Sequence, residues 1–225
     1  MQIINSIQSI YDKKSSSCYS CHCDWTITED SQNATFNKLT IHKEGVDFTV
    51  IDNAFYKGLN AITHERSSFL CDSDCDGIAL VEGKDHNQFI FVDLKSSFSE
   101  SSIRKAFHQD FFSFLKIHVM LSLCEDYHLD KTQLFFYAAC PPCKTKSEED
   151  SIKDSLLMGK TINNVRFIDK CLLSYFYSTD GFMCKIEDLP IVNDKKLRQD
   201  ILSTDIVFRI HTPKSTTDNE STIFL

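Results

Sequence analysis

Two acidic residues and a lysine stand at the ends of two short apolar segments of the chain. Asp76 begins the first segment, residues 76–81, and Asp93 and Lys95 end the second, residues 89–95. In a β-strand, side chains two residues apart point to the same face, so Asp93 and Lys95 should lie side by side. Asp76, on the neighbouring strand, should lie close to both. An otherwise apolar strand has no structural need for this charged group, which therefore indicates a functional site. The alternative is that Asp76 caps a turn and Asp93 pairs with Lys95 on the surface.

The chemistry that these residue types suit is metal-assisted hydrolysis of a phosphodiester bond. Mg²⁺ or Mn²⁺ prefers oxygen ligands and keeps several water molecules, so a few protein oxygens are enough to bind it. Asp76, Asp93 and the backbone carbonyl of Leu94 are the predicted metal ligands. Lys95 would orient the attacking water, or help to deprotonate it, and balance the negative charge of the transition state.

The pattern of Asp76 followed by Asp93-Leu94-Lys95 resembles the core motif of the PD-(D/E)xK nuclease superfamily. Members of that superfamily have the restriction-endonuclease-like fold. The resemblance implies a metal-dependent nuclease whose substrate is DNA in preference to RNA. It also implies a role as a nuclease effector in bacterial restriction or anti-phage defence.

The resemblance covers residues 72–139 and extends to positions outside the core motif. Cys75 stands where the family's name has proline, a position that varies within the family. Many members add a glutamate from an upstream helix, for which Glu65 is the candidate, and a glutamine on the helix after the lysine, for which Gln109 is the candidate. Gln109 would contact the metal-bound water or a phosphate. An inactivated member of the family would keep the fold and serve as a non-catalytic binding module.

Hydrophobic periodicity predicts an α/β fold around this site. Residues 38–51 read as a β-hairpin that turns at Glu44-Gly45, and the two strands of the site follow it. A helix over residues 100–126 and an apolar strand over residues 133–139 come next, and this crossover predicts a parallel strand pair. The predicted fold is a restriction-endonuclease-like core, a central mixed sheet flanked by helices, with an N-terminal β-hairpin elaboration.

Composition is that of a packed globular protein. The chain has 225 residues, of which 42% are hydrophobic and 12% aromatic. It divides into an N-terminal cysteine-containing segment, residues 1–35, a nuclease-like domain, residues 36–211, and a polar tail, residues 212–225, which is expected to be loose. No apolar run reaches the length of a membrane span and no signal-peptide core is present, so the expected location is the cytoplasm, without membrane contact.

Ten cysteines in a chain without an export signal should be mainly free thiols. Three of them lie with a histidine in the run Cys18-Tyr19-Ser20-Cys21-His22-Cys23. Together with Cys71 and Cys75, or with Cys140 and Cys143, this run could build a structural Zn²⁺ site. Buried or incidental thiols are the alternative interpretation.

A second motif that could carry chemistry is Cys140-Pro141-Pro142-Cys143, which follows an apolar strand. It resembles the active-site turn of thioredoxin-like proteins, in which a helix N-terminus lowers the pKa of the first thiol. In a thiol oxidoreductase of that kind, Cys140 would attack a disulfide and Cys143 would resolve it. The residues that follow, 144–151, are charged and do not begin an immediate amphipathic helix. The alternative is a strand that ends in a proline turn with two idle thiols.

Net charge limits how this chain could bind nucleic acid unaided. The formal charge is -8, with 32 acidic against 24 basic side chains. Contacts between basic side chains and phosphates supply most of the non-specific affinity for DNA, so weak binding by the isolated chain is expected. We therefore expect a protein partner, such as a helicase or a sensor ATPase, or a homodimer that combines the basic residues of two copies.

Overall fold

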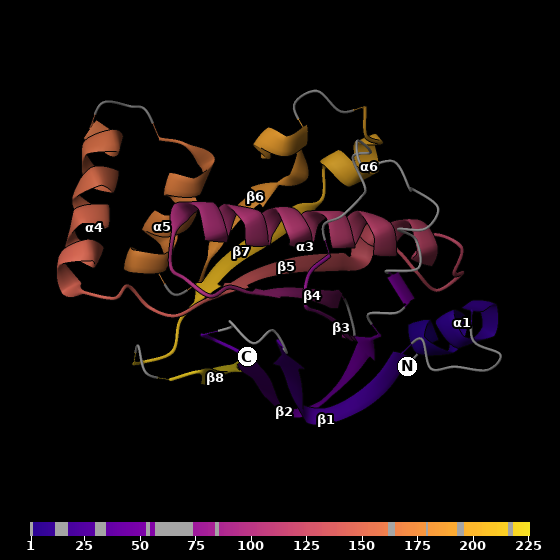
Figure 1. The fold of residues 1–225 in the computed structure, drawn as a ribbon. Coiled ribbons are helices and arrows are strands. Elements are labelled where there is room, and N and C mark those ends of the chain that lie inside the picture. The colour runs from indigo at the N-terminus through magenta and orange to yellow at the C-terminus, as the bar shows by residue number, and fades with distance from the viewer. Residues whose placement is uncertain are drawn as a thin grey trace.

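A mixed eight-stranded sheet forms the centre of the computed structural model (Figure 1). Its strands follow the order β1-β2-β3-β4-β5-β7-β6, and β8 pairs with β2 outside this path. The chain is therefore an α/β protein with an open mixed sheet and flanking helices. The structure describes residues 2–11, 18–29, 35–52, 55–56, 74–83, 86–161, 165–178, 180–192, 196–215 and 218–225.

The two predicted strands of the site lie at the middle of this sheet. β3 (Gly77–Val81) pairs antiparallel with β4 (Asn87–Leu94), and β4 pairs parallel with β5 (Thr132–Ala139). The prediction of a parallel crossover is confirmed. β5 pairs parallel with β7 (Asp205–His211), whose other neighbour is the antiparallel edge strand β6 (Phe182–Lys185). The carboxyl ends of β4, β5 and β7 thus meet at one edge of the sheet.

One long helix, α3 (Glu100–Leu121), covers the middle of one face of the sheet. It begins at the N-cap Ser99, whose side chain accepts a hydrogen bond from the Ser102 amide at 3.1 Å. Its aromatic side chains pack edge-to-face on the sheet, as Phe114 does on Phe91 with ring centroids 6.2 Å apart. The helix is shorter than predicted, because it ends at Leu121 and not near Asp126.

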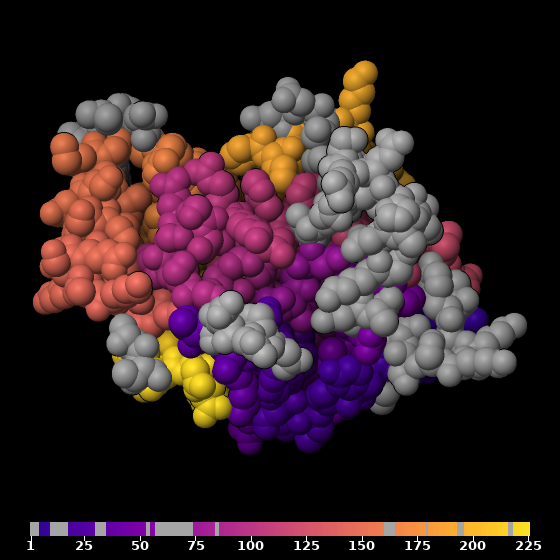
Figure 2. Space-filling model, in the orientation of Figure 1, coloured from indigo at the N-terminus to yellow at the C-terminus, as the bar shows by residue number. Residues whose placement is uncertain are grey.

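The other helices lie around α3 and mostly on the same side of the sheet. Figure 2 shows the outer surface of α3 in magenta at the centre, with α4 in orange beside it. None of the helices in the described part of the chain is long and apolar enough to cross a membrane. The other helical segments that the structure describes from end to end are α1 (Gln2–Tyr11), η2 (Leu129–Lys131), α4 (Lys146–Thr161), α5 (Phe167–Tyr177), η3 (Ile186–Asp188), η4 (Pro190–Val192) and α6 (Gln199–Leu202).

The predicted N-terminal hairpin over residues 38–51 is wrong, because these residues form one strand, β2 (Lys38–Ile51). The hairpin partner of β2 is β1 (Cys18–Thr28), which pairs with it antiparallel. The turn signal at Gly45 marks a bulge, where Cys23 of β1 stands opposite residues 43–46 of β2. Both Gly45 (φ 67°) and Cys23 (φ 61°) have the left-handed backbone conformation that such a bulge requires.

Beyond this bulge, the β1–β2 ribbon bends over the second face of the sheet. Trp25 and Ile27 of β1 are buried there in one cluster with Ala79 of β3 and Val92 of β4. Gly77 permits this approach, since a Cβ atom at that position would lie 2.8 Å from side-chain atoms of both Trp25 and Ile27. Helices therefore cover one face of the central strands, and a layer of strands covers the other.

Both ends of the chain contribute strands to this layer. The boundary predicted between residues 35 and 36 separates β1 from its partner β2. The tail was predicted to be loose, but its residues Glu220–Phe224 form β8, which pairs parallel with the first half of β2. Ile223 is buried there in the same cluster as Trp25 and Ile27, which is the second hydrophobic core of the protein. The Lys38 ammonium bonds Glu220 Oε2 at 2.8 Å. Figure 2 shows β8, in yellow, next to the indigo and purple atoms of β1 and β2.

Candidate active site

Asp93 and Lys95 lie at the carboxyl end of β4, on the face that α3 covers. Alternation along β4 places them on the same side as Phe89 and Phe91, whose rings belong to the core beneath α3. The Lys95 ammonium forms an ion pair with Asp93 Oδ1. The Asp93 side chain is 1% exposed and the Lys95 side chain 13%, so the pair is almost entirely withdrawn from water. The predicted side-by-side placement of these two residues is confirmed.

Asp76 joins this pair from the residue just before β3. Its backbone N–H donates to the Val92 carbonyl at 2.9 Å, which extends the β3–β4 ladder by one bond. Its carboxylate Oδ2 accepts a hydrogen bond from the Leu94 N–H at 2.6 Å. The negative charge of Asp76 acts on the Asp93 carboxyl group, so the two carboxyl groups titrate as a pair.

Burial sets the protonation state of this carboxyl pair. It raises the pKa of Asp93 to about 8, the Lys95 ammonium opposes the rise, and the negative charge of Asp76 adds to it. Burial also raises the pKa of Asp76, although the hydrogen bond from Leu94 N–H works against that rise. At neutral pH the pair therefore holds one proton, which a cation could displace.

Gln109 of α3 lies beside this pair, as the motif predicted. Its Oε1 accepts a hydrogen bond from Lys95 Nζ at 2.7 Å, and its Nε2 donates to the Asp74 carbonyl at 2.8 Å. The Lys95 ammonium is thus held between a carboxylate and an amide oxygen. Glu65, the other predicted residue, lies outside the described residues.

The segment that ends in Asp76 is fastened to α3 by a row of polar side chains. Gln109, Ser113 and Lys116 are spaced at i, i+4 and i+7, so they form one stripe along the helix. Ser113 Oγ accepts a hydrogen bond from the Cys75 N–H at 2.9 Å, and Lys116 Nζ bonds Asp74 Oδ1 at 2.6 Å. Lys116 is only 2% exposed, so this ion pair is buried. The stripe fixes the backbone that carries Asp76 against the end of β4.

A third acid near the pair, Asp110, was not identified from the sequence. It is fully buried, and among the described residues neither of its carboxylate oxygens has a hydrogen-bond partner. Burial raises its pKa well above the usual value, and the negative charge of Asp93 raises it further. A signal was present, because Asp110 follows Phe107 by three residues and precedes Phe114 by four, which places a carboxyl group on the apolar stripe of the helix.

The residues present fit a hard divalent cation that keeps much of its water. Asp76 and Asp93 offer carboxylate oxygens, and no amide, ammonium or hydroxyl donor of the described residues reaches Asp93 Oδ2. Leu94, whose carbonyl is the third predicted ligand, lies between Asp93 and Lys95. No group of three His, Cys, Asp or Glu side chains among the described residues is arranged to hold a metal ion. The donor set therefore suits Mg²⁺ or Mn²⁺ with water ligands and not a closed structural site.

A cavity opens on the side of Asp76 that faces away from α3. Its volume is about 190 Å³, and Tyr19, Thr26, Asp52 and Gly77 are among the residues that line it with Asp76. The cavity lies where β1, β2 and β3 come together. Asp76 is therefore the member of the pair that borders space large enough for a ligand group.

The Cys140-Pro141-Pro142-Cys143 turn lacks the features that activate a thiol. Cys140 is fully buried, and burial raises its pKa to about 12. Burial also raises the pKa of Cys143 to about 11, and the nearby acids Glu148 and Glu149 contribute to the rise. The prediction that residues 144–151 form a charged loop is wrong, because α4 begins at Lys146. Both thiols nevertheless keep raised pKa values, the opposite of an activated cysteine.

The cysteines of the predicted zinc cluster are spread along β1. Cys18 is buried in the core beneath the helices, Cys21 packs against the second core, and Cys23 lies in the bulge. Cys71, one proposed partner, lies outside the described residues. The described members of the cluster do not converge on a common point.

No family model, no curated protein and no solved structure matches this chain. The candidate site is therefore interpreted from its own geometry. That geometry brings together Asp76, Asp93, Lys95 and Gln109 from three separate elements. It adds Asp110, and it provides a raised carboxyl pKa of the kind that clusters at functional sites.

The buried acid Asp110 should make the stability of the protein depend on pH. The folded state keeps a proton on Asp110 that the unfolded state loses above about pH 4, so stability falls as pH rises above that value, by up to about 1.4 kcal/mol per pH unit. The variant Asp110→Asn lacks this titration. We expect it to be more stable than the wild type at pH 8, with the difference shrinking toward pH 4, in urea titrations across that range.

The matched control is Asp130→Asn, because Asp130 is an exposed acid outside the site. Its stability should follow the wild-type pH dependence. Parallel curves for the wild type and Asp110→Asn would contradict the assignment of a protonated, buried Asp110.

Proposed function

We propose that the protein is a metal-dependent nuclease that hydrolyses phosphodiester bonds with a site of the PD-(D/E)xK type. The observation that carries the proposal is the buried arrangement of Asp76, Asp93 and Lys95, in which one carboxylate oxygen of Asp93 has no donor partner among the described residues. DNA is the proposed substrate and restriction or anti-phage defence the proposed setting. Both come from the motif resemblance alone.

Each side chain has a role that follows from its contacts. Asp76 and Asp93 hold the cation, with the carbonyl of Leu94 as a further ligand. The cation, when bound, supplies Lewis-acid activation of the phosphate and a water of lowered pKa. Lys95 is held by Asp93 and Gln109 at a fixed position, from which its ammonium orients a water molecule and offsets negative charge on the phosphate oxygens.

The surrounding contacts keep these groups in place. Gln109 bonds both Lys95 and the backbone of Asp74, so it couples the position of the lysine to that of the segment bearing Asp76. A preorganised ammonium needs no rearrangement as charge develops in the transition state. Burial strengthens its interaction with that charge, because the surrounding medium is less polar than water.

Replacement of Lys95 tests the proposed catalysis. Lys95→Ala should reduce cleavage of plasmid DNA in the presence of Mg²⁺ or Mn²⁺ by about 10²- to 10³-fold or more, because it removes charge stabilisation from the transition state. Binding of DNA should change little. Asp93→Asn should also abolish cleavage and should weaken cation binding.

The control for these variants is Lys153→Ala, which breaks an ion pair with Glu149 on α4 away from the site. It should cleave at the wild-type rate, and EDTA should stop cleavage by both proteins. Cleavage by Lys95→Ala at the wild-type rate would refute the site. DNA binding without any metal-dependent cleavage by the wild type would instead support a non-catalytic module with this fold.

Cation binding should release a proton from the carboxyl pair. Since the pKa of Asp93 is raised to about 8, the site is protonated below that pH, and the ion must displace the proton. The apparent affinity for Mn²⁺ should rise about tenfold per unit between pH 6 and pH 8 and then level off. Calorimetry in two buffers of different ionisation enthalpy should detect about one proton released per ion at pH 7.

The variant Asp93→Asn serves as the control, since it has no proton to release at this position. Equal affinity of the wild type for Mn²⁺ at pH 6 and pH 8 would show that the pair does not bind the ion.

We further propose that DNA reaches this site with the help of a protein partner, such as a helicase or a sensor ATPase, or in a homodimer. Two lysines at the site are already paired, Lys95 with Asp93 and Lys116 with Asp74. The net charge of -8 adds long-range repulsion of phosphate.

The isolated chain should therefore bind duplex DNA weakly, with a Kd above about 1 µM near 150 mM salt, in a fluorescence-anisotropy titration. Gel filtration at the same protein concentration separates the monomer from a dimer. Tight, salt-tolerant binding by a monomer would contradict the need for a partner.

A further inference from the structure

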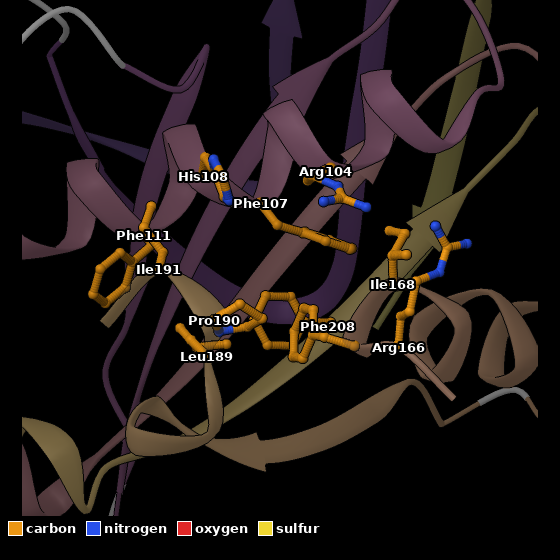
Figure 3. Close-up of a pocket in the computed structure, with 11 residues that line it drawn as sticks. Arg104, Phe107, His108, Phe111, Arg166, Ile168, Leu189, Pro190, Ile191 and Phe208 are labelled. Atoms are coloured by element: carbon orange, nitrogen blue, oxygen red, sulfur yellow. The ribbon is translucent and has the colours of Figure 1, made fainter. Parts of the chain in front are cut away.

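A second cavity lies on the other flank of α3, away from the carboxyl pair (Figure 3). Its volume is about 200 Å³, and it is enclosed by α3, the start of α5, residues 189–191 and β7. Most of the residues in its walls are apolar, and four of them are phenylalanines. Among the residues that form these walls are Phe107, Phe111, Phe167, Phe208, Leu189 and Pro190.

Three nitrogen-bearing side chains line the same cavity. Figure 3 shows Arg104 and His108 on α3, and Arg166 on the opposite wall. Arg104 and Arg166 are both about half exposed, so they mark the mouth of the cavity. They are joined by Glu100, which accepts bonds from both guanidinium groups.

The two arginines differ in how far their donors are used. Arg166 makes a two-bond contact with Glu100 and also bonds Asp169 as part of the capping box of α5. Arg104 uses only one nitrogen, Nη2, on Glu100, and its other N–H groups have no partner among the described residues. Arg104 therefore retains donors for an anion at the mouth.

His108 lines the cavity on α3, one helical turn after Arg104. Burial lowers its pKa, and the positive charge of Arg104 lowers it further, so the imidazole is neutral at pH 7. Within the described residues the ring has no hydrogen-bond partner. A neutral imidazole in this position can donate one hydrogen bond and accept another without repelling Arg104 or an apolar ligand.

We propose that this cavity binds a small molecule with a planar body of one or two rings and one acidic group. The ring would occupy the space between the phenylalanine side chains, and the acid would accept hydrogen bonds from Arg104, with His108 next to it. The size fits, because apolar cavities of about 150 Å³ hold a benzene molecule, whereas drug-sized ligands fill about 300 Å³ or more. The binding site shares α3 with the candidate active site but none of its residues, so it does not depend on the proposed nuclease activity.

Isothermal titration calorimetry with two matched pairs of probes tests this site. Indole-3-acetate and 3-methylindole differ by a carboxylate, and adenosine monophosphate and adenosine differ by a phosphate. We expect at least one acid to bind the wild-type protein with a Kd of about 1 mM or tighter, and at least fivefold more tightly than its neutral counterpart. The pair that shows the larger difference identifies the acid as a carboxylate or a phosphate.

Three variants locate the binding. Arg104→Gln should remove the preference for the acid, whereas Lys105→Gln, on the adjacent and exposed residue of α3, should keep it. Ile191→Trp should fill the cavity and abolish binding of both members of the pair. Arg104 is half exposed, so its replacement should leave the circular dichroism spectrum unchanged. Absence of binding by every probe, equal affinity for acid and neutral probes, or an unchanged preference in Arg104→Gln would overturn the proposal.

Discussion

The ammonium of Lys95 is the centre of a buried polar chain on which the candidate site depends. From Asp93 the contacts run through Lys95 to Gln109, from Gln109 to the backbone of Asp74, and from the carboxylate of Asp74 to Lys116. They join β4, α3 and the segment before β3. Withdrawing such charges from water costs several kcal/mol per ion, and apolar side chains of similar volume would give equal or greater stability. The core is rich in phenylalanine, so the stability of the fold alone does not account for this polar chain.

The position of these polar contacts follows from the way in which other elements cover the two faces of the sheet. The antiparallel β3–β4 pair brings the first residue before β3 next to the last residues of β4, and α3 lies directly above both. On the opposite face the bent β1–β2 ribbon packs against the same strands and leaves a cavity beside Asp76. The carboxyl pair thus lies between two layers, one that fixes its geometry and one that borders an opening.

Sequence patterns correctly predicted the placement of site residues that lie close together in the sequence. The period of two along β4 placed Asp93 beside Lys95, and the motif placed Gln109 near them. The hairpin turn predicted at Gly45 was wrong, because a glycine with positive φ occurs in a bulge as well as in a hairpin turn. The pairing of β8 with β2 joins residues such as Lys38 and Glu220, which are far apart in the sequence, so no local pattern could reveal it.

Asp110 illustrates why a buried acid is harder to predict than a buried apolar residue. Thirteen of the 22 residues of α3 are buried, so the helix is enclosed on more than the one face that rests on the sheet. A polar residue on such a helix needs a partner, and Ser113 and Lys116 find theirs in the segment before β3. Asp110 is buried and, within the described part of the chain, has no donor for its oxygens, while the charges of Asp93 and Asp76 raise its pKa. The negative charge of Asp93 raises the pKa of Asp110, so the protonation of this buried acid is linked to that of the carboxyl pair.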